Sequence, residues 1–183
     1  MQLRDAGAED SRRCILSFSS EEPYGRWWGV EILSHAAGAL QLQRLQDIGV
    51  LLFNHNRDFV LGKILRAWVE NNRGNAEVEF DPDTQADGIF QKVRNKTLPG
   101  VSVGYKVDVW EEVEGGATST DGRFKGPCSI ATRWEPLEIS IVSVPADATV
   151  GVGRDVADVI PYRLFAAERQ ITINKNRIGG LKA

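Results

Sequence analysis

Short runs in which apolar and polar residues alternate, separated by turn residues, recur along most of this 183-residue chain. A strand points successive side chains to opposite faces, so a period of two predicts half-buried β-strands. Clusters of Gly, Asn, Pro and Ser between the runs indicate turns. The sequence therefore predicts a mainly β (α+β) fold, with strands at 13–19, 27–33, 50–53, 59–71, 76–80, 101–110, 128–134 and 137–142.

One helix is predicted before the strand at 101–110. The segment Asp81–Thr84 is typical of a helix start, because Asp or Thr can cap the first turn and acidic residues favour its positive end. Ile89 and Val93 follow at helical spacing, and Pro99-Gly100 ends the segment.

We expect one folded domain at residues 13–165, because the chain is long enough to bury a substantial core and no linker divides it. Residues 1–12 are polar and are expected to be flexible, and the basic segment 166–183 is expected to be loose or cleavable. Residues 111–126 are acidic and then rich in Gly, Ser and Thr, which predicts a flexible loop. Further helices are expected within 146–170.

The composition argues against several classes of function. A net charge of −3 without a dominant basic stripe gives no case for nucleic-acid binding. The apolar run Ile48–Phe53 is too short to cross a bilayer, and charged residues interrupt the start of the chain, so no signal peptide is expected. Two histidines and two cysteines lack metal-site spacing, and two cysteines are too few for a disulfide framework, which indicates a reducing compartment. We expect no cofactor, metal, nucleic acid or membrane.

Three polar side chains stand at or within apolar strands, namely His55, Ser102 and Glu138. A serine hydroxyl becomes a nucleophile when an imidazole takes its proton, and a carboxylate holds that imidazole in the required tautomer. Strand alternation points Ser102 away from its valine neighbours, onto the face that also carries Gly104. Each residue also has a structural role open to it, as a turn cap, a donor to nearby backbone, or the partner of an arginine.

Three blocks around these residues resemble the signature blocks of the tailed-phage prohead (capsid maturation) serine proteases. They are Leu51–Gly62 (LLFNHNRDFVLG), Gln91–Tyr105 (QKVRNKTLPGVSVGY) and Trp134–Ala146 (WEPLEISIVSVPA), and they occur in the family's order. The resemblance runs from about residue 15 to residue 153. It implies a fold related to the herpesvirus assemblin proteases: a closed or nearly closed, mostly antiparallel β-barrel surrounded by helices.

The resemblance also implies a serine endopeptidase with Ser102 as nucleophile and His55 as general base. Glu138 matches the position of the third, acidic member. The alternatives for that acid are Asp58, Asp108 and Glu135. The implied substrates are segments of a capsid or scaffolding protein and the chain itself, inside the assembling phage prohead in the host cytoplasm. A homo-oligomer is expected, because the related assemblin proteases work as dimers.

Two other functions stay open. One is a non-enzymatic β-barrel assembly module of a phage head, in which the serine only packs. The other is a cysteine hydrolase that uses Cys128 with His55, although Cys128 follows Gly126-Pro127 in a predicted loop without a recognisable flanking pattern. Labelling with a serine-reactive phosphonate distinguishes the serine enzyme from the assembly module, and activity that survives thiol alkylation distinguishes it from the cysteine enzyme.

Overall fold

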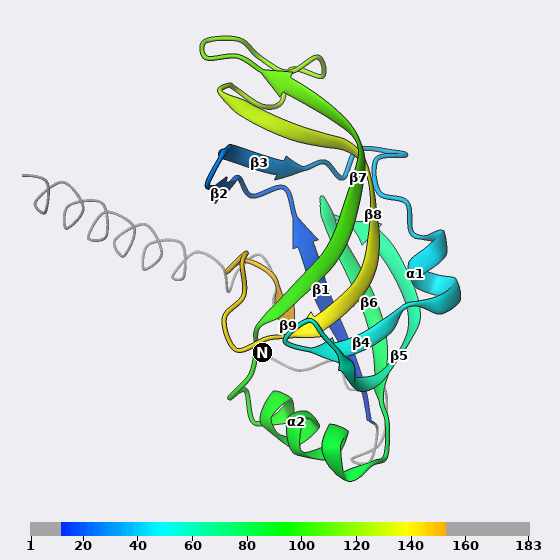
Figure 1. The fold of residues 1–183 in the computed structure, drawn as a ribbon. Helices are drawn as coiled ribbons and strands as arrows, with labels where there is room; N and C mark the ends of the chain where they lie inside the picture. The colour runs from blue at the N-terminus through cyan, green and yellow to red at the C-terminus, as the bar shows by residue number, and fades with distance from the viewer. Residues whose placement is uncertain (1–11, 153–183) are drawn as a thin grey trace, which may run out of the picture.

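The computed structural model describes residues 12–152, which form a nine-stranded sheet with two helices (Figure 1). The predicted mainly β class is confirmed. The expectations for 1–12, 166–183 and the helices within 146–170 fall almost wholly outside the described residues. In chain order the elements are β1 (Arg13–Ser20), β2 (Tyr24–Arg26), β3 (Gly29–Leu33), α1 (Gln43–Ile48), β4 (Val50–Phe53), β5 (Asn56–Glu70), β6 (Arg73–Phe80), α2 (Thr84–Arg94), β7 (Val101–Val113), β8 (Cys128–Ile141) and β9 (Gly151–Val152).

The sheet is curved but open. Its strands follow the order β2-β3-β8-β4-β5-β6-β1-β9, and β7 pairs with β8 beside this path. Most neighbours are antiparallel, but β8 runs parallel to both β3 and β4. The end strands β2 and β9, of three and two residues, offer few backbone groups for pairing and do not meet within residues 12–152. The closed barrel that the resemblance implied is therefore not formed there, and two helices pack beside the sheet without surrounding it (Figure 1).

Alternation along the strands builds the core. In β6 the side chains of Ala76, Val78 and Phe80 are buried, and the residues between them are partly exposed. The helix α2 packs against the end of this strand, where the rings of Phe80 and Phe90 lie 5.1 Å apart. Asp83 caps α2 by accepting hydrogen bonds from two backbone N–H groups of the first turn. The predicted helix is thus confirmed.

The long strand β8 carries part of the site described below. We predicted two strands, at 128–134 and 137–142, but one continuous strand runs through Pro136. The pairing with β7 shifts register at Gly104 and Tyr105, opposite this proline. A proline lacks the N–H that a regular ladder needs, and a bulge accommodates that loss.

Two other segments differ from the predictions because of how their strands pair. The predicted strand 27–33 is shorter, because Arg26 pairs with Gly29 and leaves Trp27-Trp28 as the turn between β2 and β3. The predicted loop 111–126 is also shorter, because β7 continues to Val113 against β8. Strand pairing in both segments outweighs the local composition.

Candidate active site

His55 lies at the tip of the β4–β5 hairpin. Phe53 pairs with Asn56, so Asn54 and His55 alone form the turn. Both residues have positive φ, 51° and 59°, as a two-residue type I′ turn requires. Asn and His are among the non-glycine residues that adopt this conformation most often. The tip is anchored to the end of β8, because the Asn54 N–H donates to the Ile141 carbonyl at 2.9 Å.

Glu138 faces the imidazole from β8. The distance from His55 Nδ1 to Glu138 Oε1 is 2.7 Å. A carboxylate only accepts hydrogen bonds, so Nδ1 carries the proton and Nε2 of the neutral ring is left as an acceptor. The Glu138 side chain is 15% exposed and that of His55 is 45% exposed. The acid is thus largely enclosed, while the ring stays accessible, as a general base requires.

Ser140 fastens both of these residues. It is fully buried, its Oγ donates to Glu138 Oε2 at 2.7 Å, and the same Oγ accepts the backbone N–H of His55 at 3.0 Å. Our sequence analysis did not identify Ser140. The available signal was the period of two in β8, which puts positions 138 and 140 on one face of the strand.

Ser102 lies on the neighbouring strand, β7, directly opposite Ser140, and Gly104 lies opposite Glu138. Directly paired residues of antiparallel strands point to the same face of the sheet. Ser102 therefore shares a face with the acid. A Cβ placed at position 104 would overlap Oε1 of Glu138, so the glycine leaves the space that the carboxylate occupies.

Ser102 and His55 line the same cavity, whose volume is about 230 Å³. Between these two described residues no hydrogen bond joins the serine hydroxyl to the imidazole. The structure thus brings His55 and Glu138 into contact and puts Ser102 on the wall of the cavity that the ring also lines.

The three alternative acids lie elsewhere. Asp108 and Glu135 both approach the ammonium group of Lys106, at 3.7 and 3.2 Å. Asp58 is exposed on β5, where its backbone N–H donates to the side chain of Asn56. Of the four acids considered, Glu138 is the one in contact with the imidazole.

The alternative nucleophile Cys128 begins β8, at the far end of that strand from Glu138. It is buried, and burial raises the pKa of its thiol, with the nearby carboxylates of Glu111 and Glu112 adding to the effect. A raised pKa disfavours the reactive thiolate. This environment does not suit a cysteine nucleophile.

Within residues 12–152 no group of three or more His, Cys, Asp or Glu side chains could hold a metal ion. Among the helices of this same part of the chain, none has both the length and the apolar character that crossing a membrane demands.

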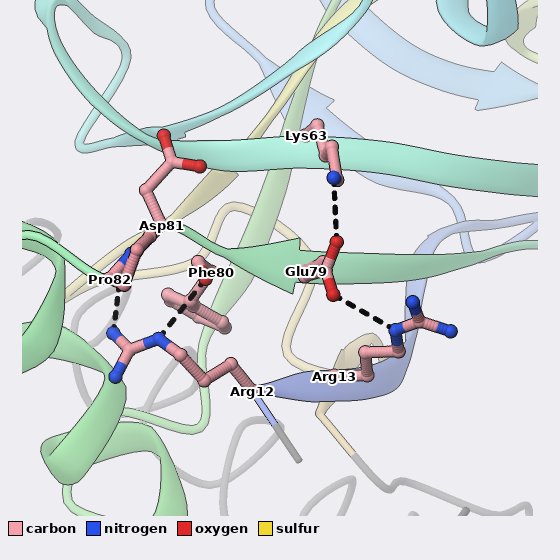
Figure 2. A pocket seen from close by; sticks show the side chains of 7 residues that line it. All are labelled: Arg12, Arg13, Lys63, Glu79, Phe80, Asp81 and Pro82. Carbon is pink, nitrogen blue, oxygen red and sulfur yellow. Dashed lines mark hydrogen bonds and ion pairs between the residues drawn. The ribbon is translucent and has the colours of Figure 1, made fainter.

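A second cavity, of about 410 Å³, lies near the start of β1 (Figure 2). Its cationic side chains are paired: Glu79 lies between Arg13 and Lys63, at 3.0 and 2.7 Å. Arg12 donates to the backbone carbonyls of Phe80 and Asp81. No serine, cysteine or histidine is among the described residues that line it, so this cavity offers no nucleophile.

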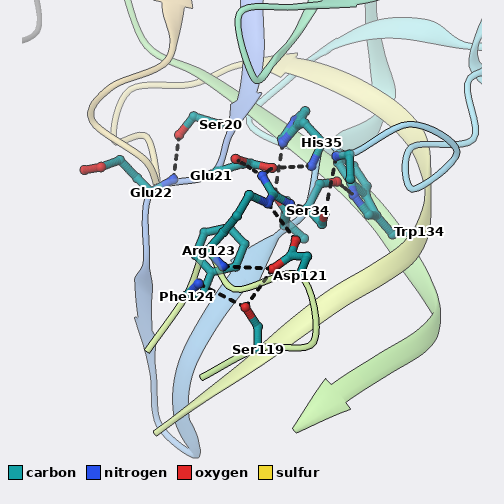
Figure 3. Close-up of polar contacts among 12 residues, drawn as sticks. Ser20, Glu21, Glu22, Ser34, His35, Ser119, Asp121, Arg123, Phe124 and Trp134 are labelled. Carbon is teal, nitrogen blue, oxygen red and sulfur yellow. Dashed lines mark hydrogen bonds and ion pairs between the residues drawn. The ribbon is translucent and has the colours of Figure 1, made fainter. Parts of the chain in front are cut away.

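A second serine–histidine pair lies in the interior. His35 Nδ1 donates to the Leu33 carbonyl at 2.9 Å, and Nε2 accepts from Ser19 Oγ at 2.8 Å. His35 packs edge-on against Trp134 (Figure 3). His35 and Ser19 are only 5% and 3% exposed. Ser19 also lines the cavity beside Ser102, but His35 does not, and both ring nitrogens of His35 already have partners, so we assign the pair to the core.

Arg123 fixes the loop between β7 and β8 close to this buried pair (Figure 3). Its guanidinium donates to both carboxylate oxygens of Glu21, at 2.9 and 2.8 Å, and to Asp121 at 2.6 Å. Glu21 also accepts the backbone N–H of His35 at 2.7 Å. These contacts hold the part of the loop around Arg123, which we predicted to be flexible, against the end of β1.

Comparison with known proteins gives two matches. The sequence model of the caudovirus prohead serine protease family matches residues 24–159. The major capsid protein of Halomonas phage phiHAP-1 is 37% identical over 145 residues, which cover 76% of this chain and 23% of that protein. The chain thus spans less than a quarter of the length of this relative. No solved structure shows significant similarity to the chain.

Proposed function

Because the chain belongs to the caudovirus prohead serine protease family, we propose that it is a serine endopeptidase of prohead maturation. In this proposal Ser102 is the nucleophile, His55 the general base and Glu138 the acid that orients the base. The observation that carries it is the 2.7 Å contact between His55 Nδ1 and Glu138 Oε1, beside a cavity that Ser102 also lines.

In the proposed reaction, Ser102 Oγ attacks the scissile carbonyl carbon and its proton passes to Nε2 of His55. The C–N bond then breaks, and the leaving amine takes that proton from Nε2. A water molecule, deprotonated by the same nitrogen, hydrolyses the acyl ester and restores Ser102. Glu138 stabilises the imidazolium that forms in both steps. The reaction requires a hydrogen bond from the Ser102 hydroxyl to Nε2, and such contacts often tighten only when substrate binds.

The proposed substrates are segments of a capsid or scaffolding protein and the chain itself, inside the assembling phage head in the host cell. Family membership supports this assignment, and so does similarity to a protein named major capsid protein. A homo-oligomer is also part of the proposal, because the assemblin proteases that the sequence resembles work as dimers.

A non-enzymatic role in head assembly is the second candidate. Two observations favour it: the relative from the Halomonas phage carries the name of a capsid protein, and no hydrogen bond joins Ser102 to His55 in the described structure. If the role is assembly alone, Ser102 has no catalytic part, and its replacement leaves the function unchanged.

Labelling with a fluorophosphonate separates the two candidates, because the reagent reacts with a serine activated by a neighbouring base. We expect labelling of the wild-type chain at Ser102, none of Ser102→Ala, and unchanged labelling of Ser143→Ala, which alters an exposed serine nearby. Absence of labelling in the wild-type chain, both isolated and assembled with its capsid protein, would support the assembly role.

A further inference from the structure

The cavity beside Ser102 and His55 contains a buried carboxylate that the proposed mechanism does not use. Glu31, on β3, lines the cavity and is 6% exposed. Its Oε1 accepts hydrogen bonds from Arg26, at 2.9 and 3.3 Å, and from the hydroxyl of Tyr105. All the hydrogen bonds to this carboxylate end on this single oxygen, as far as the described residues show.

The second oxygen, Oε2, accepts no hydrogen bond from any residue in the described range 12–152. In the same range no side-chain nitrogen or oxygen is both sealed from solvent and unpaired. Oε2 therefore faces accessible space, and we take that space to be the cavity that Glu31 lines. The result is a hydrogen-bond acceptor held in a fixed position by Arg26 and Tyr105.

The cavity that this acceptor shares with the candidate nucleophile also has an apolar part of its wall. This part includes Phe18, Leu33, Val101, Val103 and Val150. The cavity volume of about 230 Å³ is below the roughly 300 Å³ at which sites for whole small molecules begin. A space of this size next to Ser102 suits a single side chain of a bound peptide.

The charges of the lining favour a cation. The described lining residues include the carboxylates of Glu31 and Asp147 and one guanidinium, that of Arg26. Within the described part of the chain, Asp147 accepts hydrogen bonds only from uncharged groups, which belong to Ser20 and Thr149. A neutral amide could donate to Oε2, but a cation can also offset this excess of negative charge.

Building on the proposed protease function, we propose that this cavity binds a lysine or arginine side chain of the substrate, at a residue flanking the scissile bond. Glu31 Oε2 accepts a hydrogen bond from its terminal N–H group. The aliphatic stem contacts the apolar wall, as long basic side chains commonly do. An acidic side chain is excluded, because its carboxylate would meet that of Glu31.

Cleavage of matched peptides tests this proposal with the full-length chain. A randomised peptide library first gives a cleaved sequence, and peptides with Lys, norleucine or Glu at each flanking position are then compared. We expect kcat/KM for Lys to exceed that for norleucine by about tenfold or more at one position, since a hydrogen bond to a charged group contributes about that much. Equal cleavage of Lys and norleucine peptides, or a preference for Glu through Arg26, would overturn the proposal.

A charge-removing variant tests Glu31 itself. In Glu31→Gln the amide oxygen can keep the bonds from Arg26 and Tyr105, which leaves an NH₂ donor where Oε2 was. We expect the Lys-to-norleucine ratio to fall to near one, with kcat/KM for the norleucine peptide retained. The control is Glu79→Gln. Glu79 is a carboxylate outside this cavity that lies between the cations of Arg13 and Lys63, and its replacement is expected to leave the Lys-to-norleucine ratio unchanged. An unchanged ratio in Glu31→Gln would contradict the assignment.

A binding measurement separates this proposal from the proteolytic one. Fluorescein-labelled pentapeptides Ala-Ala-X-Ala-Ala, with X as Lys, norleucine or Glu, are titrated into Ser102→Ala and followed by anisotropy. A preference for the Lys peptide that is lost in Ser102→Ala/Glu31→Gln supports the proposed binding pocket. If the wild-type chain at the same time cleaves no peptide, the protease proposal is refuted and the pocket proposal is not. Cleavage without any preference for Lys refutes the pocket alone.

Discussion

The carboxylate of Glu138 occupies the space that a side chain at position 104 would fill. Gly104 and Glu138 are directly paired on β7 and β8, and a Cβ on the glycine would overlap Oε1, the oxygen that contacts His55. Gly104 does not have positive φ. The space that the Glu138 carboxylate needs therefore explains why residue 104 is a glycine, and the backbone conformation at that position does not require one.

Gly104→Ala should consequently displace Glu138 from the imidazole. We expect loss of most proteolytic activity, together with a destabilisation of about 1–3 kcal/mol from overpacking. The measurements are peptide cleavage and urea unfolding. The control is Gly88→Ala in α2, where a new Cβ meets nothing within 4 Å, and which should stabilise the helix by about 1 kcal/mol with activity unchanged. Full activity in Gly104→Ala would show that the acid does not depend on this space.

Glu138→Gln should lower kcat by roughly 10²- to 10⁴-fold, because an amide can turn its NH₂ group to Nδ1 and favour the wrong tautomer of the base. The nucleophile survives, so some activity should remain and fluorophosphonate labelling should slow without being lost. Asp58→Asn is the matched control and should keep wild-type kcat. If Asp58→Asn lost activity and Glu138→Gln kept it, Asp58 would become the third member.

Ser140→Ala should weaken the site without removing any proposed catalytic group. The change takes away the donor to Glu138 Oε2 and the acceptor for the His55 N–H, both in a fully buried position. Leaving these groups unpaired should cost about 1–3 kcal/mol in the free energy of unfolding. We expect a fall in kcat smaller than that of Glu138→Gln. Ser143 is the control: it is exposed, its hydroxyl makes only long contacts with Asn54, at 3.4 and 3.5 Å, and its backbone N–H keeps its bond to Asn54, so Ser143→Ala should change both quantities much less.

The free energy of unfolding should depend on pH through the protonation of the buried His35. Burial lowers its pKa from 6.5 to about 4, and the cations of Arg73 and Arg123 act in the same direction, partly offset by Glu21. Between pH 6.5 and 4 the unfolded chain therefore binds more protons at this residue than the folded chain does. The free energy of unfolding should fall as the pH falls through this window, by on the order of 3 kcal/mol in total. Above this window the residue contributes no pH dependence.

Urea unfolding at pH 7, 5.5 and 4.5 measures this dependence. In His35→Gln the part of the slope that comes from this imidazole should vanish, whatever the absolute stability of the variant. All other titrating groups are common to both proteins, so the difference between the two curves isolates His35. Identical slopes would mean that the unfolded and folded states bind the proton equally.

The sequence predicted those elements of the fold that are determined by neighbouring residues. The alternation in β6 and the cap and apolar spacing of α2 led to the correct elements, because burial on one face and a satisfied first turn are properties of contiguous residues. The same alternation put Ser102 and Gly104 on one face of a strand, as the pairing with β8 bears out. The catalytic roles of Ser102, His55 and Glu138 stay predictions.

The features that the sequence did not predict depend on pairing between strands far apart in the chain. Ser140 joins Glu138 to the backbone of His55, and nothing near position 140 in the sequence indicates that β4 lies beside it. Glu31 sits among Arg26 and Tyr105 only because β3 also pairs with β8. The sheet is open between β2 and β9, which at three and two residues are too short to show a pattern in the sequence.

The turn that presents His55 has a consequence for how such chains can vary. With two residues between paired strands and both in the left-handed region, an inserted or deleted residue would rotate the imidazole away from Glu138 and reverse which strand faces point inward. Length changes at this tip should therefore be absent from active homologues, whereas the segment between β7 and β8, far along those strands from Ser102, has room to grow. The two-residue β4–β5 turn is therefore the segment whose length we expect to stay fixed.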